Sequence, residues 1–240
     1  MIVRVGVVPH PPILVPEVAA GGAAEITPLR DACLVVARAL AQHCARWVAV
    51  AAIDPLAVTG AVSSFAGYGA DVEVVLDPAA AGTGRVELPL PLLVAAWLRG
   101  QVGGAKLAVE VSAVAPGSSL AQCRRIGSEL AQRLRGEGAP VGLLVLGDGA
   151  AAHTRLAPEY LDCRAQCLDA ALARALVAAD PGAVLSLDLP VAGELLVTGQ
   201  EAWRVGAAAA QSLAREYRGQ LLYSAAPYGV AYHVALWEAV

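Results

Sequence analysis

His10 is the residue of this chain whose surroundings best suit it to chemistry. It stands among four prolines in the stretch VVPHPPILVPE, residues 7–17, directly after the apolar run of residues 2–8. That run predicts a buried strand. Because proline fixes φ and carries no backbone N–H, His10 is expected on a stiff, non-helical loop past the strand's end. A stiff mount suits a metal ligand or a catalytic base, since errors in position are costly there. The alternative is a proline-rich connector whose histidine caps a turn, and both interpretations stay open at this point.

Two aspartates follow predicted strands in the same way. Asp54 comes after the apolar run 47–53, and Asp148 lies in Gly-Asp-Gly after the run 141–146. If these strands are parallel, both aspartates share the carboxyl edge of the sheet with His10, which is where ligands bind in open α/β sheets. The glycines beside Asp148 allow a tight turn or a close approach of backbone to a ligand. A single aspartate is more often a cap or a turn former. The grouping therefore indicates a site, and we expect His153 near it.

The elements that must position these residues alternate along the chain. Helices are predicted at residues 28–43, 89–98, 118–135, 158–178, 191–197 and 202–217. Strands are predicted at 2–8, 47–53, 72–76, 106–111, 141–146, 221–224 and 230–236. This alternation predicts an α/β fold with a mainly parallel central sheet flanked by helices. The short connection at Pro-Tyr-Gly, residues 227–229, predicts an antiparallel C-terminal hairpin at the sheet's edge. Nothing resembling a linker or a repeat divides residues 1–240, so a single domain is expected.

The composition narrows the class of partner. Apolar residues make up 57% of the chain, charged residues 16%, and the net charge is −4. Such a surface argues against nucleic acid as a partner. The sequence lacks an apolar run of about 18 residues and a secretory signal pattern, so neither membrane association nor export is expected and the protein is predicted to be cytoplasmic. Cys163 and Cys167, four residues apart on a predicted helix, are expected to be buried small hydrophobes.

Three segments resemble one protein family. PHPPILVPE, residues 9–17, resembles the opening motif of the LigB-type class III extradiol ring-cleavage dioxygenases and their Memo-like relatives. Gly-Asp at 147–148 resembles that family's Gly-Asp-x-Ser-His segment, and APYGVAY, residues 226–232, resembles its closing strand region. The resemblance implies an α/β fold holding non-haem Fe(II) between two histidines and a carboxylate. It further implies a histidine acting as acid and base while dioxygen opens a catechol ring.

The family's histidines carry over only in part. His10 matches the first metal histidine. The second usually lies in Ser-Pro-His after the second strand, but here the segment reads Asp-Pro-Leu, so Leu56 stands at the ligand position. The acid/base histidine would fall at Ala151, and His153, two residues later, could replace it only in a reshaped loop. Asp148 and His153 are thus the candidate catalytic residues, and the iron triad is expected to be incomplete.

The third metal ligand of the resemblance falls between Glu194 and Glu201, with Thr198 where Memo-like proteins have cysteine. Asp54 could replace the missing imidazole. A set made of His10, Asp54 and Glu194, or Glu201 in its place, is rich in oxygen and would suit harder cations than iron. The resemblance therefore implies Fe(II) or another divalent metal bound weakly, or no metal at all.

Two functions follow from the resemblance. The first is a class III extradiol dioxygenase-like enzyme acting on a small aromatic ligand, with ring cleavage altered or absent. The alternative is a non-catalytic Memo-like binding or scaffold protein, and a homo-oligomer is compatible with both. His233, inside the apolar run 230–236, is expected to be a packed or interface histidine.

Overall fold

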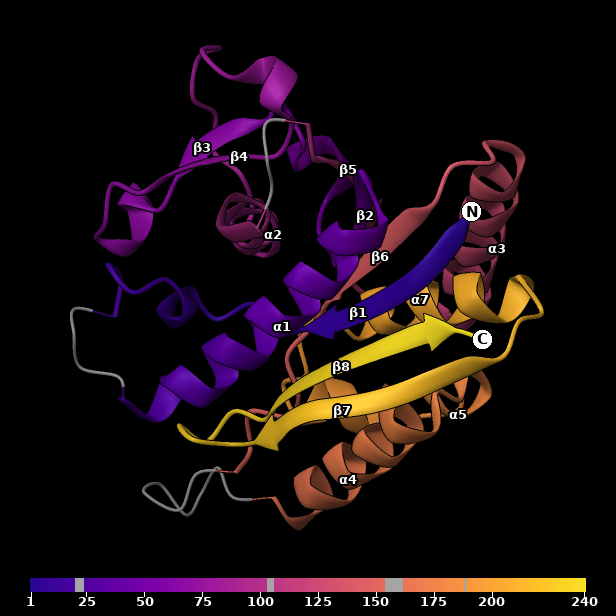
Figure 1. Cartoon of the computed structure of the whole chain (residues 1–240). Helices are drawn as coiled ribbons and strands as arrows, with labels where there is room; N and C mark the ends of the chain where they lie inside the picture. Colours follow the sequence, from indigo (N-terminus) through magenta and orange to yellow (C-terminus); the bar gives the residue numbers. More distant parts are fainter. Residues whose placement is uncertain (20–23, 103–105, 154–161, 188) are drawn as a thin grey trace.

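A six-stranded sheet forms the centre of the molecule (Figure 1). The computed structural model describes residues 1–19, 24–102, 106–153, 162–187 and 189–240. In spatial order the strands are β5 (Ala108–Val114), β2 (Arg46–Ala52), β6 (Val141–Leu146), β1 (Ile2–Val8), β8 (Tyr232–Ala239) and β7 (Tyr217–Ala225). The first four are parallel, whereas β8 runs antiparallel to β1 and β7 antiparallel to β8. The predicted α/β fold with an antiparallel C-terminal hairpin is confirmed.

Helices cover both faces of this sheet (Figure 1). One face carries α1 (Thr27–His43) and α2 (Leu90–Val102); the other carries α3 (Leu120–Gly136), α4 (Cys163–Ala178), α5 (Pro181–Leu185), α6 (Leu189–Glu194) and α7 (Gln200–Ser212). Successive residues of a strand point to opposite faces. On β1, Val5 and Val7 therefore join the core beneath α7, whereas Gly6 lies against Val36 of α1. Each face thus has a hydrophobic core of its own.

The remaining elements are short. Two three-residue strands, β3 (Val62–Ser64) and β4 (Glu73–Val75), form a small antiparallel sheet of their own. Single turns of 3-10 helix lie at η1 (Pro12–Leu14), η2 (Ala24–Ile26), η3 (Pro55–Ala57), η4 (Ala66–Tyr68) and η5 (Pro78–Ala80). Among the described residues, none of the helices combines the length and the apolarity needed to cross a bilayer.

Some element boundaries differ from those predicted. The predicted helix at 202–217 ends at Ser212, because Ala214 has a φ of 49° and Tyr217 already belongs to β7. The helix predicted from residue 158 begins at Cys163 as described, where Asp162 caps it, and residues 158–161 lie outside the described residues. Cys163 and Cys167 are exposed, so the expectation that they are buried was wrong: they lie on the face of α4 that points away from the core.

The parallel register brings the polar loops to one edge of the sheet. Leu146 is the register partner of both Val8 in β1 and Ala51 in β2. The loops that carry His10, Asp54 and Asp148 therefore leave the same edge from three adjacent strands. Because β7 runs in the same direction as β1, the end of β7 and the start of β8 lie at this carboxyl edge too.

Candidate functional site

His10 is fixed at the carboxyl edge through its main chain. Its backbone N–H donates to Asp148 Oδ1 at 2.8 Å, and its ring Nδ1 lies 3.5 Å from the same oxygen. The ring is buried, and within the described part of the chain its Nδ1 has no hydrogen-bond partner. Burial lowers the pKa of His10, and the nearby charge of Asp148 opposes this only in part. His10 is therefore a neutral imidazole at neutral pH, with a buried nitrogen free for a ligand.

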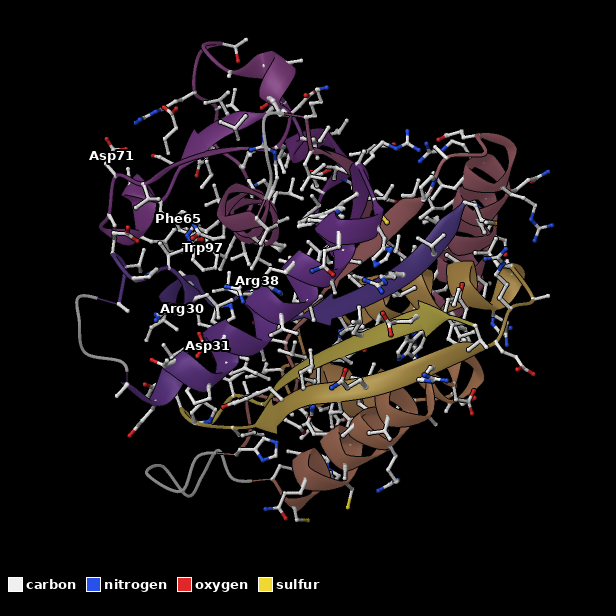
Figure 2. All side chains as sticks on the ribbon, viewed as in Figure 1. Arg30, Asp31, Arg38, Phe65, Asp71 and Trp97 are labelled. Carbon is white, nitrogen blue, oxygen red and sulfur yellow. The ribbon has the colours of Figure 1, made fainter. Side chains whose placement is uncertain are left out.

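The loop after His10 is braced by α1. Prolines start the η1 turn, and Arg30 of α1 donates from Nε to the carbonyl of Leu14 at 2.6 Å and from Nη2 to that of Ile13 (Figure 2). A guanidinium that holds two consecutive carbonyls removes much of the freedom of a short loop. These two hydrogen bonds support the expectation that His10 lies on a rigid loop.

The backbone of Asp148 is held by Thr198, fifty positions later in the chain. Its backbone forms an isolated bridge with Thr198, in which Asp148 N–H donates to Thr198 O at 2.8 Å and Thr198 N–H to Asp148 O at 3.3 Å. The approach is close because glycines stand on both sides. A Cβ on Gly147 would lie 2.5 Å from Trp203 Nε1, and one on Gly199 would lie 2.6 Å from Leu146 O. The glycine before Asp148 therefore serves close packing.

A second group surrounds the carboxylate of Asp169, a buried residue of α4. His153 Nε2 lies 2.6 Å from Asp169 Oδ2, and His233 Nε2 lies 3.1 Å from Asp169 Oδ1. The backbone N–H of Ala150 also donates to Oδ1, at 3.3 Å, and Ser224 Oγ lies 3.0 Å from His233 Nδ1. We call His153, Asp169, Ser224 and His233 the Asp169 cluster.

Backbone hydrogen bonds lock the loop of His153 to the turn between β7 and β8. Gly149 N–H donates to Ala231 O at 2.7 Å, Ala231 N–H to Ala150 O at 2.9 Å, and His153 N–H to Gly229 O at 3.1 Å. A Cβ on Gly149 would lie 2.5 Å from Asp169 Oδ1. Only glycine lets the loop pass this close to the carboxylate, so residue 149 is part of how the cluster is built.

The two groups lie on opposite faces of the same edge. Tyr232 and His233 are neighbours on β8 and point to opposite faces: Tyr232 joins the core under α1, and His233 meets Asp169 of α4. Burial, together with the negative charge of Asp148, raises the pKa of Tyr232 to about 12. Asp148 is thus on the α1 face with Tyr232, and the Asp169 cluster is on the α4 face.

Asp54 and Leu56 reach the same edge but have local roles. Asp54 is exposed and caps η3, its Oδ1 accepting from the backbone N–H of Leu56 at 2.9 Å. The side chain of Leu56, at the position of the family's second metal histidine, is 84% exposed. The loop is therefore placed as expected at the edge, while its carboxylate is engaged by its own turn.

Neither glutamate candidate meets His10 in the contacts between described residues. Glu194 is exposed at the end of α6, where its Oε2 accepts from Arg164 Nη1 at 2.6 Å. Glu201 is buried in the first turn of α7, and its Oε1 accepts from the backbone N–H of Gly117 at 2.8 Å. Each carboxylate already has a partner that accounts for its position.

These residues do not fit an iron triad as placed. A leucine offers no donor atom, Asp54 caps its own turn, and the carboxylate of Glu194 is paired with Arg164, which also binds Asp162. Within the described ranges, His, Cys, Asp and Glu side chains form no group of three or more that could hold a metal ion. Weak binding of Fe(II) or another divalent cation stays a prediction.

Sequence reasoning missed Asp169 and the role of His233. Asp169 stands among Ala165, Leu172 and Leu176, all buried residues of one helical face. An acidic residue on the apolar face of a helix is uncommon unless it is paired, and that pattern could have indicated it. His233 is buried as expected, but both of its ring nitrogens have polar partners.

Comparison with models of known protein families gives no match, and comparison with curated proteins gives none either. The resemblance to class III extradiol dioxygenases therefore stays a prediction.

Proposed function

We propose that the carboxyl edge of the sheet is an acid–base site for a small aromatic ligand, in a cytoplasmic protein of class III extradiol dioxygenase type that has lost or changed iron-dependent ring cleavage. The observation that carries this proposal is the 2.6 Å contact between His153 Nε2 and Asp169 Oδ2. A histidine oriented by a buried carboxylate is the usual arrangement of a general base in enzymes.

The contact decides which nitrogen of His153 can take a proton. A carboxylate only accepts hydrogen bonds, so the nitrogen that faces Asp169 carries the hydrogen and Nδ1 keeps its lone pair. The side chain of His153 is 15% exposed, so solvent or a ligand at the rim can reach part of the ring. When Nδ1 takes a proton, the adjacent carboxylate stabilises the imidazolium that forms.

His10 and Asp148 supply the binding half of the proposal. A phenolic hydroxyl can donate or accept a hydrogen bond, and the buried, unpartnered Nδ1 of His10 calls for a polar group of that kind. The two halves lie on opposite faces of the sheet, and the loop 147–153 at their shared edge carries both Asp148 and His153. A ligand that contacts both halves must therefore cross the edge beside this loop. Substitution of His10 or Asp148 should then affect ligand binding, and substitution of His153 should affect proton transfer.

The test is a panel of catechols and other small phenols in heavy water. A base that removes the hydroxyl proton, delivers a deuteron to a ring carbon and then removes the original hydrogen from that carbon replaces ring hydrogen with deuterium. Proton NMR follows that exchange without oxygen or metal. We expect exchange with the wild type, and a loss of about a hundredfold or more in His153→Gln, as is usual for a general base. His43→Gln, an exposed histidine at the end of α1, is the control. Equal exchange in wild type and His153→Gln would reject the proposal.

The residues at the family's metal positions favour a second, non-catalytic function. Leu56, and Glu194 bound to Arg164, leave the family's iron chemistry without its ligands. A non-catalytic Memo-like binding or scaffold protein, alone or as a homo-oligomer, needs none of them. In the same experiment it would bind a phenol, seen as shifts of the His10 ring signals, without exchange of ring hydrogen.

A further inference from the structure

We infer that His233 and Ser224 are positioning residues that hold His153 in its working orientation through the shared carboxylate of Asp169. The inference concerns the base assigned under the proposed function and rests on it for its functional meaning. His233 and Ser224 come from the C-terminal hairpin, and His153 from the loop after β6. The Asp169 carboxylate therefore joins two distant parts of the chain at one point.

The hydrogen positions in the cluster follow from the acceptor at its centre. Both Nε2 atoms face Asp169 oxygens, so both Nε2 atoms carry hydrogen. The Nδ1 of His233 is then an acceptor, and the hydroxyl of Ser224 is its donor at 3.0 Å. Without the hydrogen bond from Ser224, the tautomer of His233 that carries hydrogen on Nε2 would be less favoured.

His233 matters to His153 because an aspartate carboxylate can rotate. The terminal torsion of aspartate has a broad, two-fold energy profile, so its partners decide where each oxygen points. Oδ1 is held by His233 Nε2 at 3.1 Å and by the longer Ala150 N–H bond at 3.3 Å, which leaves Oδ2 for His153. Without His233 the longer bond alone holds Oδ1, and the short contact to His153 loosens.

A purely structural role for the pair makes a different prediction. Ser224 and His233 are register partners on β7 and β8, so their hydrogen bond could serve only to satisfy a buried ring. In that case the removal of His233 would change stability and leave the hydrogen bond of His153 as it was. The two roles can therefore be separated by observing the His153 ring directly.

The experiment follows the ring proton on His153 Nε2 by NMR, without any ligand. A short hydrogen bond to a carboxylate moves such a proton far downfield and slows its exchange with water. We expect the wild-type signal, assigned by its loss in His153→Gln, to exchange about tenfold faster or more in His233→Phe, the change expected when a bond to a charged group is weakened. His233→Gln, whose amide can donate to Asp169, should restore much of the protection.

Ser224→Ala tests the outer member of the cluster in a fold that it disturbs little, because Ser224 is exposed. Its matched control is Ser212→Ala, at the end of α7, whose hydroxyl pairs with that of Ser128. We expect faster exchange of the His153 proton in Ser224→Ala and none in the control. An unchanged His153 proton in folded His233→Phe and Ser224→Ala would overturn the inference. If protection falls as expected but no phenol exchanges hydrogen, the positioning stands and the proposed function alone fails.

Discussion

The backbone N–H of His10 and the carboxylate of Asp148 are 2.8 Å apart, so the first histidine of the site is held through its main chain rather than through its ring. This contact joins the loops after β1 and β6, which are adjacent parallel strands. Among the described residues, Nδ1 of the His10 ring has no hydrogen-bond partner, and the charge of Asp148 lies 3.5 Å from it.

Asp148→Ala should lower the free energy of unfolding by about 1–3 kcal/mol, because it leaves the N–H of His10 without its acceptor. Asp148→Asn keeps an acceptor oxygen and should cost less. Both variants should lower the pKa of His10 further, since they remove the charge that opposes the effect of burial. Urea unfolding and NMR titration of His10 measure the two effects, and a rise in the pKa of His10 would contradict the assignment.

Gly149→Ala should destabilise the protein by about 1–3 kcal/mol, as overpacking usually does. The new methyl group would lie 2.5 Å from Asp169 Oδ1 and 2.8 Å from the Cβ of Ala231. The matched control is Gly136→Ala at the end of α3, where a Cβ would meet nothing within 4 Å. Thermal unfolding of both variants checks the prediction, and equal stability of the two would show that the loop can move away from Asp169.

Tyr232 should make stability depend on pH in the alkaline range. Its folded pKa, about 12, is above the ordinary value of 10, so the folded state holds the phenolic proton more tightly than the unfolded state. The contribution is therefore complete below pH 10 and is lost as the pH rises to 12, by up to about 2–3 kcal/mol. Urea unfolding of wild type and Tyr232→Phe between pH 9 and about 11 measures it. A decline of equal size in both proteins would point to other groups.

Cleavage of simple catechols should be absent or very slow, even when Fe(II) is supplied before oxygen is admitted. Leu56 stands where the resemblance requires a metal histidine, and Ala151 where it requires the acid and base. Leu56→His should raise the affinity for iron if that alignment is right. Iron content and oxygen consumption of the two proteins decide the matter, and ring cleavage by the wild type at ordinary enzyme rates would show that other residues have taken over.

The fold was largely predictable because its signals are local. The apolar runs that form β1 and β6 were found with their observed ends, and parallel pairing then brought His10, Asp54 and Asp148 to one edge. The contacts of the side chains were not predictable in the same way. Asp169 meets His153 and His233 through the packing of α4 on the C-terminal hairpin. Packing between elements that are distant in the chain cannot be predicted from a short stretch of sequence.

The position of β1 has a consequence for how the protein is made. In the sheet β1 lies between β6 and β8, which are both synthesised much later than β1. During synthesis β1 therefore waits with both of its edges unpaired, and closing such long loops slows folding. The Asp169 cluster cannot be complete before the β7–β8 hairpin docks, because this hairpin supplies His233 and the backbone that anchors His153. We therefore expect ligand binding at this edge to appear only once this hairpin has docked, as time-resolved refolding would show.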